Sequence, residues 1–504
     1  MAESGNNNYD AIIIGSGLSG LLCGYILAKE GFNVCILEKH HQPGGNLQTF
    51  TRDGHKFETG VHYSGGLGPG KTLNRYWNYF GLTHSLKLQQ LDVDCFDKIS
   101  IGDCEFPLAQ GSENFIDRLL PYFPGAGAEL ADYLLQTAGV VADFPLYNLE
   151  LPAGHNEQHH MTRSAPEFFD KFSRCLNPAS GIPLSSILAG NNFLYGGSPL
   201  APLHAASLIS HSLISGAYRI IGGSDQVTRI LTDGIREQGG TVLTRQEAIS
   251  ITRSGATFTT GTSKGESFNS GMIISGIHPA ATLSMMPADL VRPAYRNRIA
   301  SLSDTVSSFI LYLTLKPRSF PYLNYNFYHH ESHEPWNETS LKGSSWPGMF
   351  LLSTACHEPA QEFAETATIL TYMQAEEVAR WNDTSTGKRG MAYQDFRNER
   401  AEKLMQLVLC RFPALKGAVS HMEISTPLTY RDYTGTPGGS LYGIQKSYRD
   451  PVMTTVLPRT KIPNFYFTGQ NTNLHGLLGV TIGAVITCGE ILGLGYILKK
   501  IRSA

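Results

Sequence analysis

The stretch YDAIIIGSGLSGLLCGYILAKEGFNVCILEKH, from Tyr9 to His40, decides the fold of this chain. Its first apolar run, Ala11 to Ile14, is typical of a buried parallel strand, and a glycine-rich turn follows it. Apolar side chains then recur at helical spacing from residue 18 to residue 30, and a second apolar run covers residues 33–37. This order of strand, turn, helix and strand predicts a doubly wound, Rossmann-type α/β sheet.

The turn has the spacing of a dinucleotide-binding loop. Gly15 permits the tight bend, Gly17 lets the backbone approach a pyrophosphate, and Gly20 lets the helix pack closely on the strand. The phosphates are expected at the N-terminus of the helix, where unpaired N–H groups and the helix dipole favour anions. The candidate cofactor ligands in this turn are Gly15, Ser16, Gly17, Leu18, Ser19 and Gly20.

Glu38 ends the second predicted strand about 20 residues beyond the glycines, where an acid holds the ribose hydroxyls of an adenine nucleotide. A carboxylate in this place would repel a 2′-phosphate. The residue therefore favours FAD or NAD over NADP.

Further motifs connect the chain to a known family. Residues 43–46 read PGGN and residues 57–65 read FETGVHYSG; near the other end, residues 464–470 read NFYFTGQ and residues 476–484 read GLLGVTIGA. With these motifs the chain resembles the flavin-dependent oxidoreductases that include phytoene desaturases, carotenoid isomerases, retinol saturases and, more distantly, amine oxidases. FETGVHYSG is most similar to the retinol saturase form. Residues 218–249 resemble the second βαβ portion of this family.

The resemblance implies FAD as the cofactor and a glutathione-reductase-like, Rossmann-type FAD-binding domain with a discontinuous α+β substrate domain. It implies that the last helix points its N-terminus at the flavin ring. The further cofactor contacts that it implies are Glu38, Lys39, Gly44, Gly45, Asn46, Ala248, Gly469, Gln470, Gly479 and Val480. Asn46 stands where amine oxidases carry Arg, which argues against that branch, and Gln470 replaces an acid that many relatives have. Gln48 replaces the usual His of retinol saturases.

We expect the FAD-binding domain to comprise residues 1–75, 215–285 and 425–504. Residues 76–214 and 286–424 would form the substrate domain. The segment between Arg174 and Arg219 contains no Asp, Glu, Lys or Arg. Asn, Gly and Pro residues interrupt it too often for a membrane span. It is either a buried core helix, from Leu203 to Ala217, or the lining of an uncharged tunnel for a long apolar substrate.

Composition excludes other classes of protein. The 504 residues are 41% hydrophobic and carry a net charge of −3, which is unlike a nucleic-acid-binding or disordered chain. The eight cysteines include no CxxC pair, so we expect reduced thiols. The start of the chain shows no secretory signal. We expect a cytoplasmic protein, either free or in peripheral contact with a membrane.

The histidine clusters and the basic end of the chain have simple interpretations. We interpret His155, His159 and His160, and likewise His329, His330 and His333, as solvated loop residues and predict no metal site. Lys499, Lys500 and Arg502 follow the last apolar helix, where they either cap the helix dipole or bind acidic lipid.

The resemblance predicts an FAD-dependent oxidoreductase that acts on carbon–carbon double bonds of a polyene or related apolar lipid, with saturase-like reduction favoured. The electron donor or acceptor is open. Candidate proton donors are His62 and Tyr63, with His475 as a third. Alternative activities are those of a carotenoid desaturase or a flavin-dependent carotenoid isomerase. An alternative of another class is a non-catalytic, FAD-containing lipid-binding protein.

Overall fold

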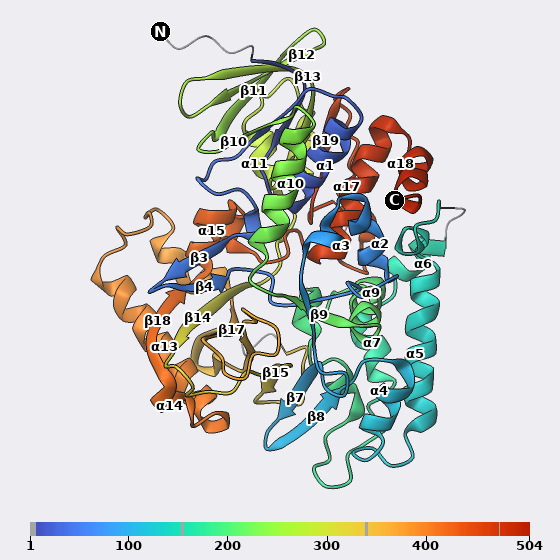
Figure 1. The fold of residues 1–504 in the computed structure, drawn as a ribbon, viewed down its shortest axis with the longest axis vertical. Helices are drawn as coiled ribbons and strands as arrows, with labels where there is room; N and C mark the ends of the chain where they lie inside the picture. Colours follow the sequence, from blue (N-terminus) through green and yellow to red (C-terminus); the bar gives the residue numbers. More distant parts are fainter. Residues whose placement is uncertain (1–6, 153–155, 338–340, 473) are drawn as a thin grey trace.

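The computed structural model describes residues 7–152, 156–337, 341–472 and 474–504. Two large sheets dominate it, one in the upper and one in the lower half of Figure 1. The first sheet has the strand order β10 (Thr241–Leu243), β2 (Val34–Leu37), β1 (Asn8–Ile14), β13 (Ser267–Ser275), β12 (Thr257–Thr262) and β11 (Ala248–Ser254), with β19 (Phe465–Phe467) also paired to β13. The strands β10, β2, β1, β13 and β19 are parallel, and β12 and β11 are antiparallel. The predicted Rossmann-type α/β fold is confirmed.

Both faces of the first sheet are covered, which explains why its strands read as continuous apolar runs. Ala11 and Ile13 of β1 pack in one core with α1 (Leu18–Lys29), α10 (Asp225–Glu237) and α17 (Gly476–Leu492). Ile12 and Ile14 point to the opposite face and pack with α11 (Pro279–Ser284) and α12 (Pro293–Ala300).

The second sheet is mostly antiparallel. Its strand order is β18 (Val419–Ser425), β14 (Ser307–Leu315), β17 (Thr366–Met373), β16 (Met349–Thr354), β15 (Asn326–His330), β7 (Asp97–Ile101) and β8 (Cys104–Leu108). Alternate residues of β14 enter two cores. Phe309 and Leu311 pack with α13 (Met391–Arg411), whereas Ile310 and Tyr312 face the helices α5 (Gly127–Ala142) and α9 (Leu203–Ile214).

Short elements connect the two halves. A hairpin of β3 (Thr49–Arg52) and β4 (His55–Glu58) and a small sheet of β5 (Ser64–Gly65), β9 (Ala217–Ile220) and β6 (Leu88–Gln90) lie between the large sheets. The remaining α-helices are α2 (Thr72–Tyr79), α3 (Leu82–Ser85), α4 (Ser112–Leu119), α6 (Asn156–Met161), α7 (Ala165–Asp170), α8 (Leu184–Leu188), α14 (Leu415–Ala418), α15 (Pro427–Thr434), α16 (Pro451–Thr454) and α18 (Leu494–Arg502).

The predicted domain boundaries remain predictions. Some helices near these boundaries, however, pack on the other half of the molecule from the one to which the prediction assigns them. The helices α2 and α3 share a core with α1 and α17, and Trp77 Nε1 donates to Thr481 Oγ1 at 3.2 Å. Likewise α12 packs on the first sheet. Helices just beyond residues 75 and 285 therefore pack on the nucleotide-binding half.

Within the described ranges, no helix has both the length and the apolarity of a membrane span. All eight cysteines are free thiols, and Cys410 is exposed.

Candidate active site

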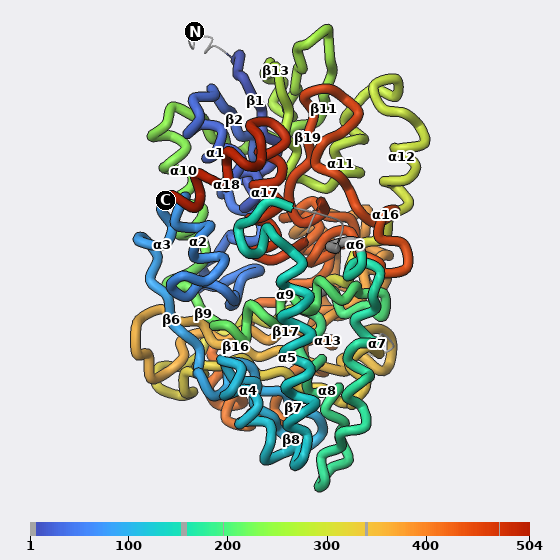
Figure 2. The backbone as a smooth tube through the Cα atoms, turned by 90° about the vertical axis from the view of Figure 1, so that its right-hand side faces the viewer, coloured from blue at the N-terminus to red at the C-terminus, as the bar shows by residue number. Residues whose placement is uncertain are grey.

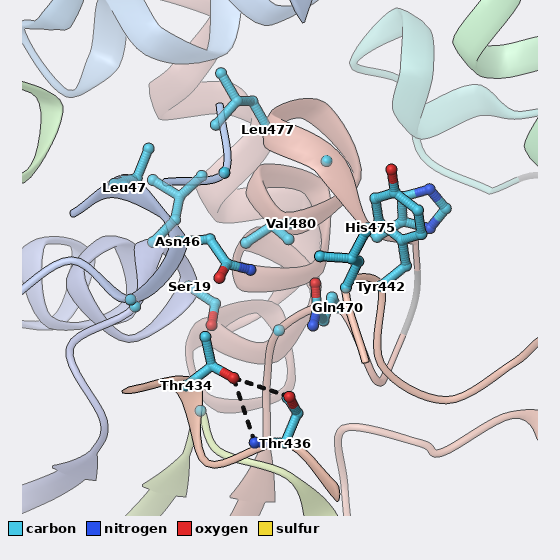
Figure 3. Close-up of a pocket in the computed structure, with 18 of the residues that line it drawn as sticks. Ser19, Asn46, Leu47, Thr434, Thr436, Tyr442, Gln470, His475, Leu477 and Val480 are labelled. Carbon is cyan, nitrogen blue, oxygen red and sulfur yellow. Dashed lines mark hydrogen bonds between the residues drawn. The ribbon is translucent and has the colours of Figure 1, made fainter. Parts of the chain in front are cut away.

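One large cavity, of about 680 Å³, extends from the glycine-rich turn of the first sheet to the second sheet. Figure 3 shows part of its wall, where Asn46, Gln470 and Val480 approach one another from three segments that are far apart in sequence. The predicted site residues that line this cavity are Gly15, Gly17, Leu18, Ser19, Glu38, Lys39, Gly44, Gly45, Asn46, His62, Tyr63, Ala248, Gly469, Gln470, His475, Gly479 and Val480. Ser16 and Gly20 are not part of its lining.

The three glycines of the turn have distinct surroundings. Gly15 has a φ of +90°, which favours glycine. At Gly20, a Cβ atom would lie 2.1 Å from the carbonyl oxygen of Gly15, so a side chain there would break the turn. At Gly17, a Cβ atom would meet nothing within 4 Å. This open space at the N-terminus of α1 leaves room for a phosphate group.

Glu38 is buried beside the turn, at 6% exposure. Ser16 donates to Glu38 Oε2 from its backbone N at 3.0 Å and from Oγ at 2.5 Å, and the backbone N of His40 donates to Oε1 at 2.9 Å. Ser16 thus lies behind the cavity wall and ties the turn to the end of β2. Because a carboxylate has about four acceptor sites, Glu38 retains capacity for a ribose hydroxyl.

Further residues at the nucleotide end of the cavity come from two distant parts of the chain, one just after β2 and one at the end of α15. Gly44 has a φ of +126°, and its backbone N donates to Ser16 O at 3.0 Å. Lys39 Nζ donates to Asp432 O at 3.0 Å, and burial lowers the pKa of Lys39. The segment 433–436, at the C-terminal end of α15, closes over this end and was not predicted from the sequence. Its Thr436 N donates to Thr434 Oγ1 at 3.4 Å (Figure 3).

The helix α17 begins at Gly476, directly at the cavity. Its N-terminus carries partial positive charge, which suits a group that gains negative charge. At Gly479, a Cβ atom would lie 2.7 Å from the backbone carbon of Leu474. This close approach lets the first turn of the helix reach the cavity.

His62 is neutral at physiological pH in this structure. Burial, together with the charge of Arg219, lowers the pKa of His62 to about 4. Its Nε2 atom is enclosed and has no hydrogen-bond partner among the described residues. A neutral imidazole is a weak acid, so His62 serves as a proton donor only if it is reprotonated.

The Tyr63 hydroxyl already has two partners. It donates to Asp97 Oδ2 at 2.9 Å and lies 2.8 Å from the hydroxyl of Tyr328. Burial raises the pKa of Tyr63 well above its usual value, and the nearby Asp97 adds to this. Tyr63 therefore holds its proton firmly in this arrangement.

Asp97 is the centre of a polar network that the sequence did not reveal. It is fully buried and also accepts from Asn191 Nδ2 at 3.0 Å and Asn326 Nδ2 at 2.9 Å. Arg219 joins the network by donating to Asn326 Oδ1 at 2.9 Å. Burial raises the pKa of Asp97 to about 6. Its partners come from three distant segments, so no local pattern marks this residue.

His475 lies at the start of α17 and packs against Tyr442, with ring centroids 4.4 Å apart and ring planes tilted by 34° (Figure 3). Its Nε2 donates to Leu194 O at 2.6 Å, and burial lowers the pKa of His475 to about 4. This histidine is therefore also neutral.

The end of the cavity remote from the turn is apolar. The charge-free segment contributes Leu194 and four residues of α9, namely Leu208, Ile209, Ser212 and Leu213. Across from them lie residues of the second sheet and its loops, including Leu351, Leu370, Tyr372 and Tyr442. The charged lining residues, Glu38, Lys39 and Glu247, all belong to the nucleotide end. Among the described residues, the apolar end thus has no Asp, Glu, Lys or Arg in its wall.

The interpretation of the histidines as solvated loop residues is wrong for His160, His329 and His330, which are buried. His159 is exposed as predicted, but it lies in the helix α6 and not in a loop. His329 and His330 lie in β15 between β16 and β7, and they are 1% and 4% exposed. His160 is 6% exposed, and its Nε2 lies 2.6 Å from Asp143 Oδ2. Polar neighbours in sequence suggested loops, but strand pairing and helix packing bury these rings. His155 lies outside the described residues, among which no cluster suits a metal ion.

Comparisons with known proteins agree with the site. Residues 13–80 match the NAD(P)-binding Rossmann-like domain. The chain is 28% identical to all-trans-retinol 13,14-reductase of Rattus norvegicus, over 96% of this chain and 85% of that protein. It is 21% identical to prolycopene isomerase 1 of an Oncidium hybrid cultivar (96% and 84%) and 20% identical to an inactive all-trans-retinol 13,14-reductase of Danio rerio (96% and 86%).

Among solved structures, cyclohexylamine oxidase from Brevibacterium oxydans IH-35A superposes with a TM-score of 0.62 at 16% identity, covering 98% of this chain and 99% of that one. The resemblance to the phytoene desaturase, carotenoid isomerase and retinol saturase family is confirmed, as is the amine-oxidase-like fold. The site is built for a flavin or nucleotide cofactor.

Proposed function

We propose that this protein is an FAD-dependent oxidoreductase that acts on carbon–carbon double bonds of a polyene or a related apolar lipid, in the direction of reduction. The observation that carries the proposal is the single cavity that joins a dinucleotide-binding turn to a wall without charged side chains. The full-length similarity to proteins named retinol reductases and prolycopene isomerases supports it.

The residues present suit FAD. Gly17 leaves open space at the N-terminus of α1 for a pyrophosphate, and Glu38 offers a carboxylate to the adenosine ribose. Asn46, Gln470 and the N-terminus of α17 surround the place expected for the ring system. When bound, FAD supplies the two-electron chemistry by exchanging a hydride with a substrate carbon.

The chain's own residues orient the substrate and exclude water. The aliphatic wall of α9 and the aromatic rings of Tyr372 and Tyr442 suit an extended conjugated hydrocarbon. Within this wall an ion would pay a large desolvation cost, so a neutral substrate is favoured. Saturation of a double bond also needs one proton. We propose His62 or Tyr63 as its source, with His475 as the third candidate.

We also retain two further predictions from the sequence. One is a cytoplasmic location, and the other is an external electron donor or acceptor of unknown identity. Nucleic acid is not expected as a partner.

The test uses holoprotein reduced with dithionite under anaerobic conditions and mixed with all-trans-retinol, a carotene or an unsaturated fatty alcohol. A saturase should reoxidise its flavin and yield a product heavier by two hydrogens. An isomerase should yield a product of unchanged mass and altered retention time. A desaturase should react only when oxidised, and its product should be lighter by two hydrogens.

The matched control is Gly17→Ala, which we expect to fold but to bind FAD more weakly than wild type. A lipid-binding protein without catalysis should show no change in either flavin spectrum or product. That outcome with every polyene tried would contradict the proposed function.

A further inference from the structure

We propose that α12 and the loop around α16 form a docking surface for an anionic lipid membrane. We define this docking surface as residues 287–300 and 448–461. In Figure 2, α12 and α16 lie at the same edge of the molecule, and hydrogen bonds connect them. Arg298 Nη1 donates to Met453 O at 2.8 Å and to Thr455 O at 3.2 Å.

Three apolar side chains of the docking surface project into solvent. Val452 is 81% exposed, Leu457 66% and Met453 45%. Val452 is the most exposed of the large hydrophobic residues among those described. A cluster of aliphatic side chains held outward in this way marks an interaction site.

The loop that carries these side chains is held in place by a buried residue and by hydrogen bonds from Lys446. Val456 is fully buried in the same core as Ile299 of α12. Lys446 Nζ donates to Thr454 O at 3.2 Å and to Asn471 O at 2.8 Å. A firm anchor of this kind keeps Val452 and Leu457 outside and prevents them from folding back into the core.

The charge of the docking surface differs from that of the whole chain. Its two segments contain six basic residues, Arg292, Arg296, Arg298, Arg449, Arg459 and Lys461, and two acidic residues, Asp289 and Asp450. The resulting net charge is +4, against −3 for the entire chain. Glu490 pairs with Arg459 at 2.6 Å, so a net charge of +3 remains when Glu490 is included.

Cations around protruding aliphatic side chains suit an anionic bilayer. The apolar side chains enter the boundary between headgroups and acyl chains, and the basic ones meet the acidic lipids. A nucleic acid would meet the same charge, but it would leave Val452 and Leu457 without an apolar partner. A bilayer is therefore the occupant that satisfies both features.

The docking surface is also linked to the cavity wall. Asn471, which accepts from Lys446, lines the cavity. Gln445 Nε2 donates to Ser198 Oγ at 2.5 Å, and Tyr448 N donates to Leu200 O at 3.1 Å. Both partners belong to the charge-free segment. Docking here would bring that segment close to the membrane, which is where apolar lipids reside.

The cationic end of the chain is a weaker candidate for lipid contact. Lys500 Nζ pairs with Glu30 Oε1 at 2.6 Å, and Arg502 Nε donates to Leu149 O at 2.8 Å. In Figure 2, α18 lies away from α12 and α16. The sequence prediction of membrane contact is thus best assigned to a different part of the surface.

The test is co-sedimentation of the full-length holoprotein with vesicles of phosphatidylcholine, with and without phosphatidylserine. Wild type should bind the anionic vesicles more tightly than the neutral ones, and added salt should weaken the binding because it screens the charges. The double substitution Val452→Asp with Leu457→Asp should weaken binding about tenfold or more, because two apolar insertions are replaced by repelled carboxylates.

The matched control is Leu135→Asp on α5, since Leu135 is 72% exposed and lies outside the docking surface. It should bind like wild type, and both variants should keep their flavin absorbance and melting temperature. The proposal is overturned if wild type does not bind anionic vesicles, or if Leu135→Asp loses as much binding as the double variant. It is also overturned if the double variant only converts a dimer into a monomer. Vesicle binding requires no turnover, so these outcomes are independent of the proposed chemistry.

Discussion

Replacement of Gly17 by alanine should separate cofactor binding from folding. Gly17 has φ −61° and ψ 170°, a conformation open to alanine, and a Cβ atom there would meet nothing within 4 Å. Alanine loses some capping quality at the start of α1, but it also lowers the entropy of the unfolded chain. These effects are each about 0.5–1 kcal/mol and opposite in sign. The apoprotein should therefore keep its stability to within about 1 kcal/mol.

The same methyl group would occupy the space into which the phosphate must come. If it prevents one charge-assisted hydrogen bond from the turn, binding loses about 1.5–3 kcal/mol. That loss corresponds to a dissociation constant about 10- to 150-fold higher.

The assay has two parts. Denaturant unfolding of deflavinated protein, followed by circular dichroism, reports the stability of the fold. Titration with FAD, followed by flavin fluorescence, reports the affinity. Gly20→Ala is the contrasting variant, because its Cβ atom would lie 2.1 Å from Gly15 O and should destabilise the apoprotein itself. If Gly17→Ala binds FAD as tightly as wild type, the assignment of this turn to the pyrophosphate is refuted.

Four further predictions concern the rest of the site. Glu38→Ala should lower FAD affinity by about 1.5–3 kcal/mol and remove the two hydrogen bonds that Ser16 donates to the carboxylate. Full FAD occupancy in dilute solution would show that the acid is not a ligand. Leu213→Asp places a carboxylate in the apolar wall and should impair turnover of a neutral polyene, because a buried charge is costly to desolvate. A variant that is folded, yellow and fully active would contradict the role of α9 in both packing and substrate contact. His62→Phe and Tyr63→Phe should both keep FAD, and the variant that lacks the proton donor should reoxidise its reduced flavin with the polyene about 10²–10⁴-fold more slowly. If the donor is a histidinium at position 62, activity should fall above about pH 4. Wild-type stopped-flow rates in both variants would exclude both residues. Acidification from about pH 6.5 to 4 should lower the free energy of unfolding. In the folded protein His62, His330 and His475 have pKa values near 4 and stay neutral over this range, whereas the same histidines bind protons in the unfolded chain. Asp97 and Glu58, with pKa values raised to about 6 and 7, act in the opposite direction but are fewer, and a stability that rises on acidification in urea titrations would show that the carboxyls dominate.

The nucleotide-binding part of this protein could be predicted from sequence because its determinants are local. The strand, the turn, the helix and Glu38 all lie within 40 residues. The backbone of the turn requires glycine at positions 15 and 20, whereas Gly17 leaves open space beside the turn. The segments at residues 44–46, 248, 469–470 and 479–480 also line the cavity as expected, since their motifs carry a family resemblance.

Only the tertiary structure decided the protonation and the partners of the candidate catalytic groups. Tyr63 meets Asp97 and Tyr328, which are 34 and 265 residues away in sequence, and no local pattern encodes that meeting. The low pKa of His62 depends on its burial and on the charge of Arg219, which is distant in sequence, so it could not be read from neighbours in the chain. His329 and His330 show the same limit, because a strand's position inside a sheet determines its burial. Local backbone geometry is determined by consecutive residues. Desolvation of a side chain and the charges around it depend on residues that are distant in sequence and meet only in the folded chain.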